Sequence, residues 1–203
     1  SPVPFLPTVS ASAEAARKLV GEGYKAIKLK IGRGAAVDLD HIAAVREAIG
    51  PDVGLMLDVN CGYDEATATD VGRRLSNHAI TWFEEPMEEE SIDSYIWLAS
   101  QLTLPILGPE SLGGRFLSRA AWAKQGACDI LRAGAPGNGG IGPCLKSAHL
   151  AESFGMNCEI HGGGVGNLTV VCCIKNCDWY ERGLLHPFLD YDEVPAYLNS
   201  IVD

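Results

Sequence analysis

The sequence of 203 residues lacks the features that define several other classes of protein. It has no apolar run of about eighteen residues or more, so we expect no transmembrane helix. No basic segment precedes an apolar stretch at the N-terminus, so we expect no signal peptide. Because the sequence lacks an initial Met, we expect a trimmed chain or one that begins within a longer protein.

Paired cysteines and excess basic charge are also missing. The cysteine count is odd, at seven, and no CxxC pair occurs, which favours free thiols in a reducing cytosol over a disulfide framework or a zinc site. Lys and Arg number 16 against 26 Asp and Glu, a net charge of −10. This charge argues against nucleic acid or an anionic membrane as a partner. A small anionic substrate stays compatible, because a site can be locally positive in an acidic protein.

What the chain does contain is a regular alternation of strand-like and helical segments. The strand-like segments are 24–31, 53–58, 80–84, 104–107, 129–131, 157–160 and 178–181. The helical segments between them are 38–49, 65–76, 92–101, 117–125, 141–154 and 167–175. Such alternation predicts an α/β fold in which helices cover a parallel sheet.

Two closures of that sheet compete. One is an open doubly wound sheet, and the other is a (β/α)₈ TIM-type barrel that lacks a strand, the first one, near residues 1–10 or before them. The segment 31–34 has no GxGxxG phosphate loop, which favours the barrel. A full barrel takes about 250 residues. We therefore expect residues 1–203 to form one incomplete barrel domain.

Three carboxylates follow the ends of consecutive predicted strands. An interval of 26 residues separates Asp58 from Glu84, and the same interval separates Glu84 from Glu110. Neighbouring strand ends meet at the mouth of a barrel, where three acids repel one another unless a cation neutralises them. Hard oxygen donors without Cys or His suit Mg²⁺. The alternative is that each acid caps a helix or lies in a solvated loop.

The strand 24–31 carries two lysines, Lys28 and Lys30, whose side chains share one face. If that face is the barrel interior, repulsion and partial burial favour the uncharged form of one lysine, which could then act as a general base. Ile27, Leu29 and Ile31 supply the opposite, helix-facing side. The alternative is an exposed edge strand with two solvated lysines.

Two further candidates follow the last predicted strands. His161 is followed by three glycines and lies at the end of strand 157–160, the end at which barrel active sites occur. A structural histidine is the competing interpretation. Glu181 ends the strand 178–181 and could point into the same mouth, or else forms a simple ion pair with Arg182 or a nearby cation.

Together these motifs resemble the barrel domain of the enolase superfamily, in its mandelate racemase/muconate lactonizing group. The matching segments are Lys28-Leu29-Lys30, Leu57-Asp58-Val59-Asn60, Trp82-Phe83-Glu84-Glu85-Pro86, Gly108-Pro109-Glu110, Gly139-Gly140, His161 and Glu181. The resemblance implies that Asp58, Glu84 and Glu110 bind Mg²⁺, that Lys30 removes a proton alpha to a carboxylate, and that Lys28 helps to neutralise the enolate. It also places Asn60 near the substrate carboxylate, gives Glu181 a hydrogen bond to it, and makes His161 the acid/base of the opposite face.

The sequence departs from the family pattern at one position. Counting back from Gly139-Gly140, Gly134 stands where relatives carry the Asp that orients the histidine or a Lys. This departure makes racemisation less favourable, and Arg132 could take over polar contacts to the substrate. The family's N-terminal α+β capping domain, which selects the substrate, has no match in these residues.

The resulting hypothesis is a Mg²⁺-dependent lyase that dehydrates a sugar acid to a 2-keto-3-deoxy acid. A racemase or epimerase, or a sugar-lactone cycloisomerase, is the enzymatic alternative. A barrel that binds a ligand without turnover is the non-enzymatic one. The resemblance also implies a homo-oligomer.

Overall fold

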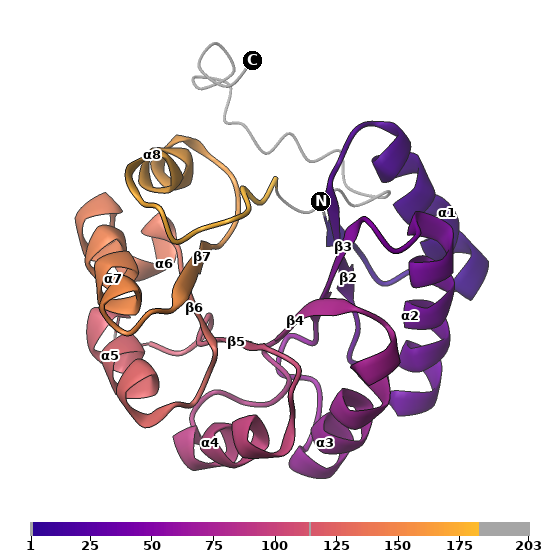
Figure 1. The fold of residues 1–203 in the computed structure, drawn as a ribbon, viewed down its shortest axis with the longest axis horizontal. Coiled ribbons are helices and arrows are strands. Elements are labelled where there is room, and N and C mark those ends of the chain that lie inside the picture. Colours follow the sequence, from indigo (N-terminus) through magenta and orange to yellow (C-terminus); the bar gives the residue numbers. More distant parts are fainter. Residues whose placement is uncertain (1, 114, 183–203) are drawn as a thin grey trace. The chain divides into compact units, whose positions relative to one another are not determined.

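The computed structural model describes residues 2–113 and 115–182, and the chain divides into two compact units, residues 1–106 (unit 1) and 107–203 (unit 2). Both units alternate strands with helices (Figure 1), as the sequence predicted. Strand β5 (Ile106–Gly108) spans the boundary between the units.

Unit 1 contains four parallel strands that pair in chain order. They are β1 (Pro2–Val3), β2 (Ala26–Lys30), β3 (Gly54–Asp58) and β4 (Ile80–Glu84). The helices are α1 (Val9–Gly21), α2 (Ala35–Ile49), α3 (Glu65–Arg74), the 3₁₀ turn η1 (Leu75–Asn77) and α4 (Ile92–Gln101). The short β1 is the strand that the sequence placed near residues 1–10.

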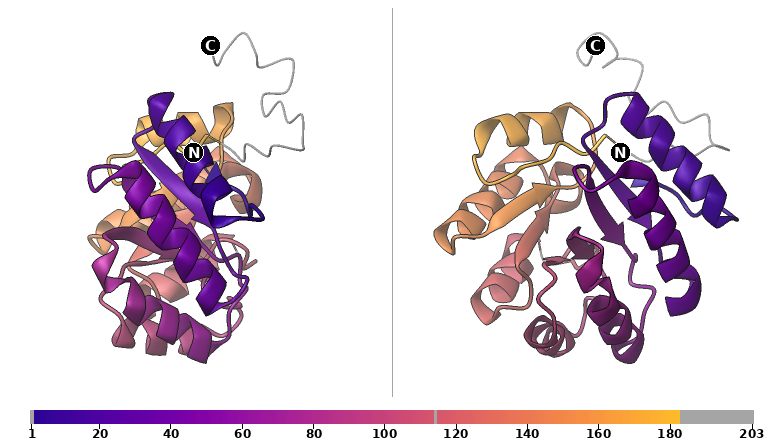
Figure 2. Two further views of the ribbon diagram at one scale, coloured as in Figure 1. Left: turned by 90° about the vertical axis from the view of Figure 1, so that its right-hand side faces the viewer. Right: turned by 45° about the vertical axis from the view of Figure 1, so that its right-hand side comes forward.

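The core of unit 1 forms where the apolar side of β2 meets helices. Figures 1 and 2 show α1 and α2 side by side next to β2 and β3. Ile27 and Leu29 of β2 are buried, as are Ile42 and Val45 of α2. Burying each such side chain contributes about 1.5–3 kcal/mol. Because alternate residues of a strand point to opposite sides, this packing leaves the lysines of β2 on the other side.

Side chains that precede the helices fix several of their starts. Thr8 Oγ1 accepts a hydrogen bond from the backbone N of Ala11 at 3.2 Å, and Asp64 Oδ1 accepts one from the N of Thr67 at 2.7 Å. Each contact satisfies one of the N–H groups that a helix leaves without a partner in its first turn.

Unit 2 continues the same pattern, with β5, β6 (Ile130–Ala133) and β7 (Asn157–Ile160) parallel and paired in chain order. Its helices are α5 (Arg115–Gln125), α6 (Ala135–Asn138), α7 (Ile141–Ser153) and α8 (Val165–Cys173). Helix α7 packs against β6 and β7 and contacts α5 and α8 (Figure 1). Small buried residues of α7, among them Cys144, Ala148 and Ala151, allow this close packing.

Two strand predictions need correction. The predicted strand 104–107 is displaced by two residues at its start, to Ile106–Gly108. The predicted strand 178–181 is wrong, because only Tyr180 pairs with β7, through an isolated bridge to Ile160. The physical reason is that the backbone N–H groups of Asp178 and Trp179 bond to a side-chain carboxylate instead of to a strand.

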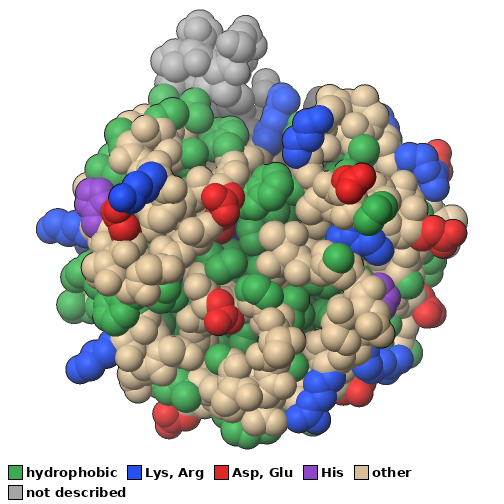
Figure 3. Space-filling model, in the orientation of Figure 1, with side chains coloured by type: hydrophobic (Ala, Val, Ile, Leu, Met, Phe, Trp, Pro, Cys, Tyr) green, Lys and Arg blue, Asp and Glu red, His purple; other side chains and the backbone are tan. Residues whose placement is uncertain are grey.

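No helix among the described residues is both long enough and apolar enough to span a membrane. On the face shown in Figure 3, Lys and Arg side chains alternate with Asp and Glu, and the described residues form no basic patch there.

Candidate functional site

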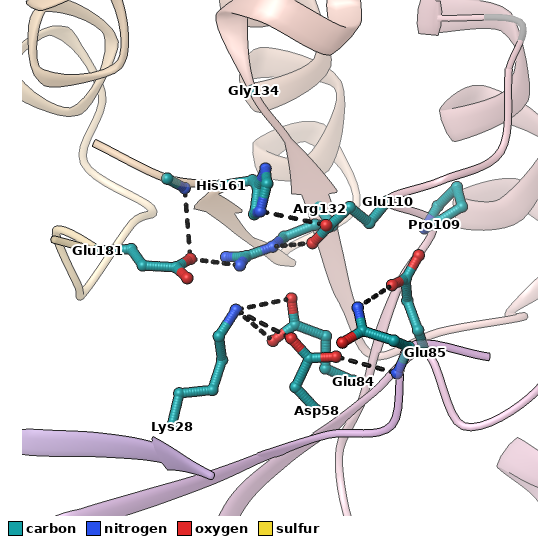
Figure 4. Close-up of polar contacts among 12 residues, drawn as sticks. Lys28, Asp58, Glu84, Glu85, Pro109, Glu110, Arg132, Gly134, His161 and Glu181 are labelled. Carbon is teal, nitrogen blue, oxygen red and sulfur yellow. Dashed lines mark hydrogen bonds and ion pairs between the residues drawn. The ribbon is translucent and has the colours of Figure 1, made fainter. Parts of the chain in front are cut away.

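The two lysines of β2 reach the carboxylates at the ends of the next two strands. The Nζ of Lys28 lies 3.2 Å from Asp58 Oδ2 and 3.2 Å from Glu84 Oε2. The Nζ of Lys30 donates to Asp58 Oδ2 and, at 2.7 Å, to Asn60 Oδ1. Figure 4 shows Lys28 pointing at both carboxylates. The prediction that these lysines turn away from the helices is therefore confirmed.

Strand register brings these groups together. Lys30 is opposite Asp58 across β2 and β3, and Asp58 is opposite Glu84 across β3 and β4. Both carboxylates are fully buried. Trp82 Nε1 donates to Glu84 Oε2 at 3.1 Å. Two buried negative charges beside two ammonium groups make a compensated cluster, which is the condition under which buried charges are tolerated.

Glu85 is a site residue to which the sequence alone gave no role. It is fully buried, and its Oε2 accepts a hydrogen bond from Asn60 Nδ2 at 3.4 Å. Since Asn60 Oδ1 accepts from Lys30, the amide of Asn60 links Lys30 to Glu85. Only its place beside Glu84 in a known motif could have pointed to Glu85.

The backbone after β3 and β4 is strained. Asn60, Cys61 and Glu85 have positive φ angles of 48°, 61° and 41°. Residues other than glycine rarely adopt this left-handed region, and such strain concentrates at functional sites. Burial, and then the charge of Glu85, raise the pKa of the Cys61 thiol to about 12. Cys61 is therefore not a nucleophile here at neutral pH.

Unit 2 assembles a second cluster around Arg132, which is 1% exposed. Its Nε lies 3.1 Å from Glu110 Oε2, and its terminal nitrogen lies 2.5 Å from Glu181 Oε2. The backbone N of Gly162 donates to the same Glu181 oxygen at 3.3 Å. His161 Nε2 lies 3.1 Å from Glu110 Oε1 (Figure 4). Glu181 thus contacts Arg132, a nearby cation of the kind that the sequence offered as its alternative partner.

Gly134 lies beside His161 in a small pocket of unit 2. The pocket has a volume of about 50 Å³, and Glu110, Arg132, Gly134 and His161 are among its lining residues. A Cβ atom on Gly134 would lie 3.2 Å from the backbone O of His161. The carboxylate that contacts the histidine is Glu110, at the end of β5 rather than on β6.

The donor set in unit 1 suits a hard divalent cation. Asp58 and Glu84 present buried carboxylate oxygens to one shared position, where they meet the Lys28 ammonium. Such oxygens are the ligands that Mg²⁺ prefers. Among the residues that the structure describes, no three His, Cys, Asp or Glu side chains form a metal-binding group. Glu110 belongs to unit 2, so the three-carboxylate site stays a prediction.

Comparisons with known proteins agree with the resemblance seen in the sequence. A family model described as "Enolase C-terminal domain-like" matches residues 11–200. The D-galactarolactone cycloisomerase of Agrobacterium fabrum is 40% identical over 158 residues, which are 78% of this chain and 42% of that protein. The arabinonate dehydratase of Saccharolobus solfataricus is 34% identical over 168 residues, which are 80% of this chain and 44% of that protein.

A solved structure extends the likeness to the fold. The crystal structure of D-glucarate dehydratase from Agrobacterium tumefaciens complexed with magnesium has a TM-score of 0.88 and 50% sequence identity. The match covers 93% of this chain and 51% of that one. The predicted α/β barrel class is confirmed by these matches. The chain spans about half the length of the proteins that it matches, or less.

Proposed function

We propose that this chain, which belongs to the enolase C-terminal domain-like family, carries the proton-abstracting site of a Mg²⁺-dependent enzyme that acts on a carboxylic acid. The observation that carries the proposal is the contact of two ammonium groups of β2 with the buried Asp58 and Glu84. A proton next to a carboxylate is weakly acidic, because its loss leaves an enediolate with two negative charges. Catalysis therefore needs a base and a concentration of positive charge.

Asp58 and Glu84 would hold the cation, and Glu110 is proposed as a third ligand from its sequence motif and its place after β5. A bound Mg²⁺ ion supplies the positive charge that stabilises the developing enediolate. The magnesium in the crystallised D-glucarate dehydratase supports this assignment.

Lys30 is the proposed base. Its side chain is 16% exposed, more than the 5% of Lys28, so a substrate can reach it. Asn60 holds the Lys30 ammonium from one side, which fixes the direction of the amine. Lys28 is more deeply buried between two carboxylates and contributes charge rather than proton transfer. Asn60 is also proposed to contact the substrate carboxylate.

The cluster in unit 2 supplies the proposed acid. His161 has a side chain that is 48% exposed, and it is proposed to donate a proton to a leaving hydroxyl. Glu181 and Arg132 are proposed to bind polar groups of the substrate. In a sugar acid, loss of the alpha proton and of the β-hydroxyl as water gives a 2-keto-3-deoxy acid.

We therefore infer a sugar-acid dehydratase as the most specific function. The names of the arabinonate and D-glucarate dehydratases support this substrate class. An isomerase is the second candidate. The contact between His161 and Glu110 favours it, because a histidine with a carboxylate partner can also return a proton to carbon, and one relative is named a cycloisomerase.

One experiment separates these functions. The chain is incubated with Mg²⁺ and a panel of galactarate, glucarate, arabinonate and galactarolactone in D₂O, and 2-keto acid is detected with semicarbazide while ¹H NMR follows the alpha proton. A dehydratase yields keto acid, a racemase yields exchange alone, and a cycloisomerase consumes the lactone.

The matched variants are Lys30→Ala and Lys25→Ala. Lys25 is exposed just before β2, so its loss leaves turnover unchanged, whereas loss of Lys30 abolishes exchange. Full exchange in Lys30→Ala would show that the base is another residue. Ligand binding without exchange in the unmodified chain would instead support a barrel without turnover.

A further inference from the structure

Glu159 is a buried acid on β7 whose carboxylate bonds to the segment that follows α8. It is 2% exposed. Its Oε1 accepts a hydrogen bond from the backbone N of Asp178 at 3.0 Å, and its Oε2 accepts one from the backbone N of Trp179 at 3.2 Å. The Sγ of Cys177 lies 3.4 Å from the same Oε2. One side chain therefore binds three consecutive residues.

Hydrogen bonds also hold both ends of the segment 176–180, which we call the latch loop. At its start, the backbone N of Cys158 donates to the O of Asn176 at 2.7 Å, and the Asn176 amide donates to the O of Ala148 at 3.0 Å. At its end, Tyr180 forms the bridge to Ile160 of β7. Between these ends, the backbone N–H groups of the loop donate to the Glu159 carboxylate rather than to a neighbouring strand.

The latch loop ends where Glu181 begins. Glu181 is the next residue after Tyr180, and its carboxylate contacts Arg132 and the backbone N of Gly162. A carboxylate in an apolar interior is costly unless hydrogen bonds compensate it. Burial raises the pKa of Glu159, and its bond from Asp178 opposes that shift. The compensating donors come largely from the latch loop, so the acid and the loop depend on each other.

We propose that Glu159 is a positioning residue, which holds the latch loop against β7 and thereby fixes Glu181 beside Arg132. The inference rests on the proposed function, in which Glu181 contacts the substrate. Glu159 also lies opposite Arg132 across β6 and β7, where the Arg132 charge acts on its carboxylate, whereas its effect on Glu181 passes through the loop backbone.

The first test is cysteine labelling and needs no substrate. In Glu159→Gln, an NH₂ group replaces one of the two carboxylate oxygens, so the backbone N–H of either Asp178 or Trp179 faces a donor instead of an acceptor. Burial, and then the charge of Glu159, raise the pKa of the Cys177 thiol to about 12, which keeps it unreactive. We expect iodoacetamide to modify Cys177 about fivefold faster in the variant, the factor that corresponds to the loss of one hydrogen bond.

Peptide mass spectrometry reports each cysteine separately, and the exposed Cys172 serves as the internal reference. The matched control is Glu152→Gln, which makes the same chemical change at an exposed ion pair with Lys175, 2.7 Å away. That control leaves Cys177 protected. Equal labelling of Cys177 in Glu159→Gln and in the unmodified chain would refute the role of Glu159 in holding the latch loop.

The second test is a double-mutant cycle with Glu181→Gln, read by the alpha-proton exchange of the proposed reaction. If Glu159 acts through Glu181, the single variant Glu159→Gln lowers kcat. The same substitution then has no further effect on kcat in the Glu181→Gln background. Two independent losses that multiply would overturn the positioning role. If no protein shows turnover but Glu159→Gln still increases the labelling of Cys177, the proposed function is refuted. The role of Glu159 in holding the loop then remains supported.

A milder variant keeps the inference testable if Glu159→Gln does not fold. Asn157→Ala removes the amide that donates to Asp178 Oδ2 at 2.7 Å and lies 3.5 Å from Glu159 Oε1. Because Asn157 is at the half-buried edge of β7, its loss loosens the same loop without removing a buried charge. We expect increased labelling of Cys177, by a smaller factor, and unchanged labelling would count against the latch.

Discussion

Replacing Lys28 with Met tests whether the buried charge cluster depends on a cation. The Lys28 side chain is 5% exposed, and it lies 3.2 Å from Asp58, which is 1% exposed, and 3.2 Å from Glu84, which is fully buried. Removing one partner of a buried ion pair costs about 3–5 kcal/mol, because the remaining charge stays uncompensated. Met has a similar length and adds little cavity, so this electrostatic cost dominates.

The assay is urea unfolding followed by circular dichroism. With a urea dependence of about 2 kcal/mol per molar, the expected loss lowers the unfolding midpoint by about 2 M. Lys25→Met is the control, since that lysine is exposed next to β2 and its loss leaves the midpoint unchanged. Equal midpoints for Lys28→Met and the control would refute the argument that the ammonium compensates two carboxylates.

Magnesium extends the same experiment. A ligand at 100 times its dissociation constant stabilises the folded state by about 2.7 kcal/mol. We expect MgCl₂ to raise the midpoint more in Lys28→Met than in the unmodified chain, because Asp58 and Glu84 then lack one of their compensating ammonium groups. The control for electrostatic screening is a calcium-free buffer in which NaCl replaces MgCl₂ at equal ionic strength. No stabilisation by Mg²⁺ in either protein would remove the metal site from the proposal.

Three predictions concern the loop after β2 and its contacts with Asp38 of α2. Asp38→Ala removes the oxygen that accepts from the backbone N–H groups of residues 32–34 and from the Tyr63 hydroxyl, so urea unfolding should show a loss of about 3–5 kcal/mol. Asp38→Asn should cost about 1 kcal/mol, because its amide oxygen can replace Oδ2 while its NH₂ takes the place of Oδ1, which has no partner among the described residues. Gly32→Ala should lower the melting temperature, because φ is +118° and the new Cβ would lie 2.8 Å from the O of Val59. An unchanged melting temperature would contradict this clash.

Periodic features of the sequence predicted the part of the site that strands create. The alternation in β2 placed Lys28 and Lys30 on one side, and the interval of one strand-helix repeat between Asp58 and Glu84 placed both at neighbouring strand ends. These predictions succeed because a strand repeats every two residues and parallel strands end at the same edge of a sheet. They depend only on local geometry.

Such patterns could not predict the contacts that loops and single side chains make. Glu159 lies within a strand, where a charged residue indicates a solvated face, yet it is buried and bonds to Asp178 and Trp179. The segment 178–181 has strand-like composition, but its N–H groups already have a carboxylate partner. Composition cannot show whether a backbone N–H group donates to a neighbouring strand or to a side chain, because the same residue types occur in both situations.

Gly134 shows how a missing residue can be compensated from another strand. The sequence predicts a histidine without its carboxylate on β6, and the structure gives His161 a carboxylate from the residues after β5, with Glu110 Oε1 at 3.1 Å. A side chain at position 134 would crowd the backbone of His161, whereas Glu110 reaches the imidazole from a different direction. Arg132 lies 3.1 Å from the other oxygen of Glu110, so one carboxylate contacts both side chains. The acid that the sequence assigned to metal binding therefore also orients the histidine, and Glu110→Gln should alter both the reactivity of His161 and the affinity for Mg²⁺.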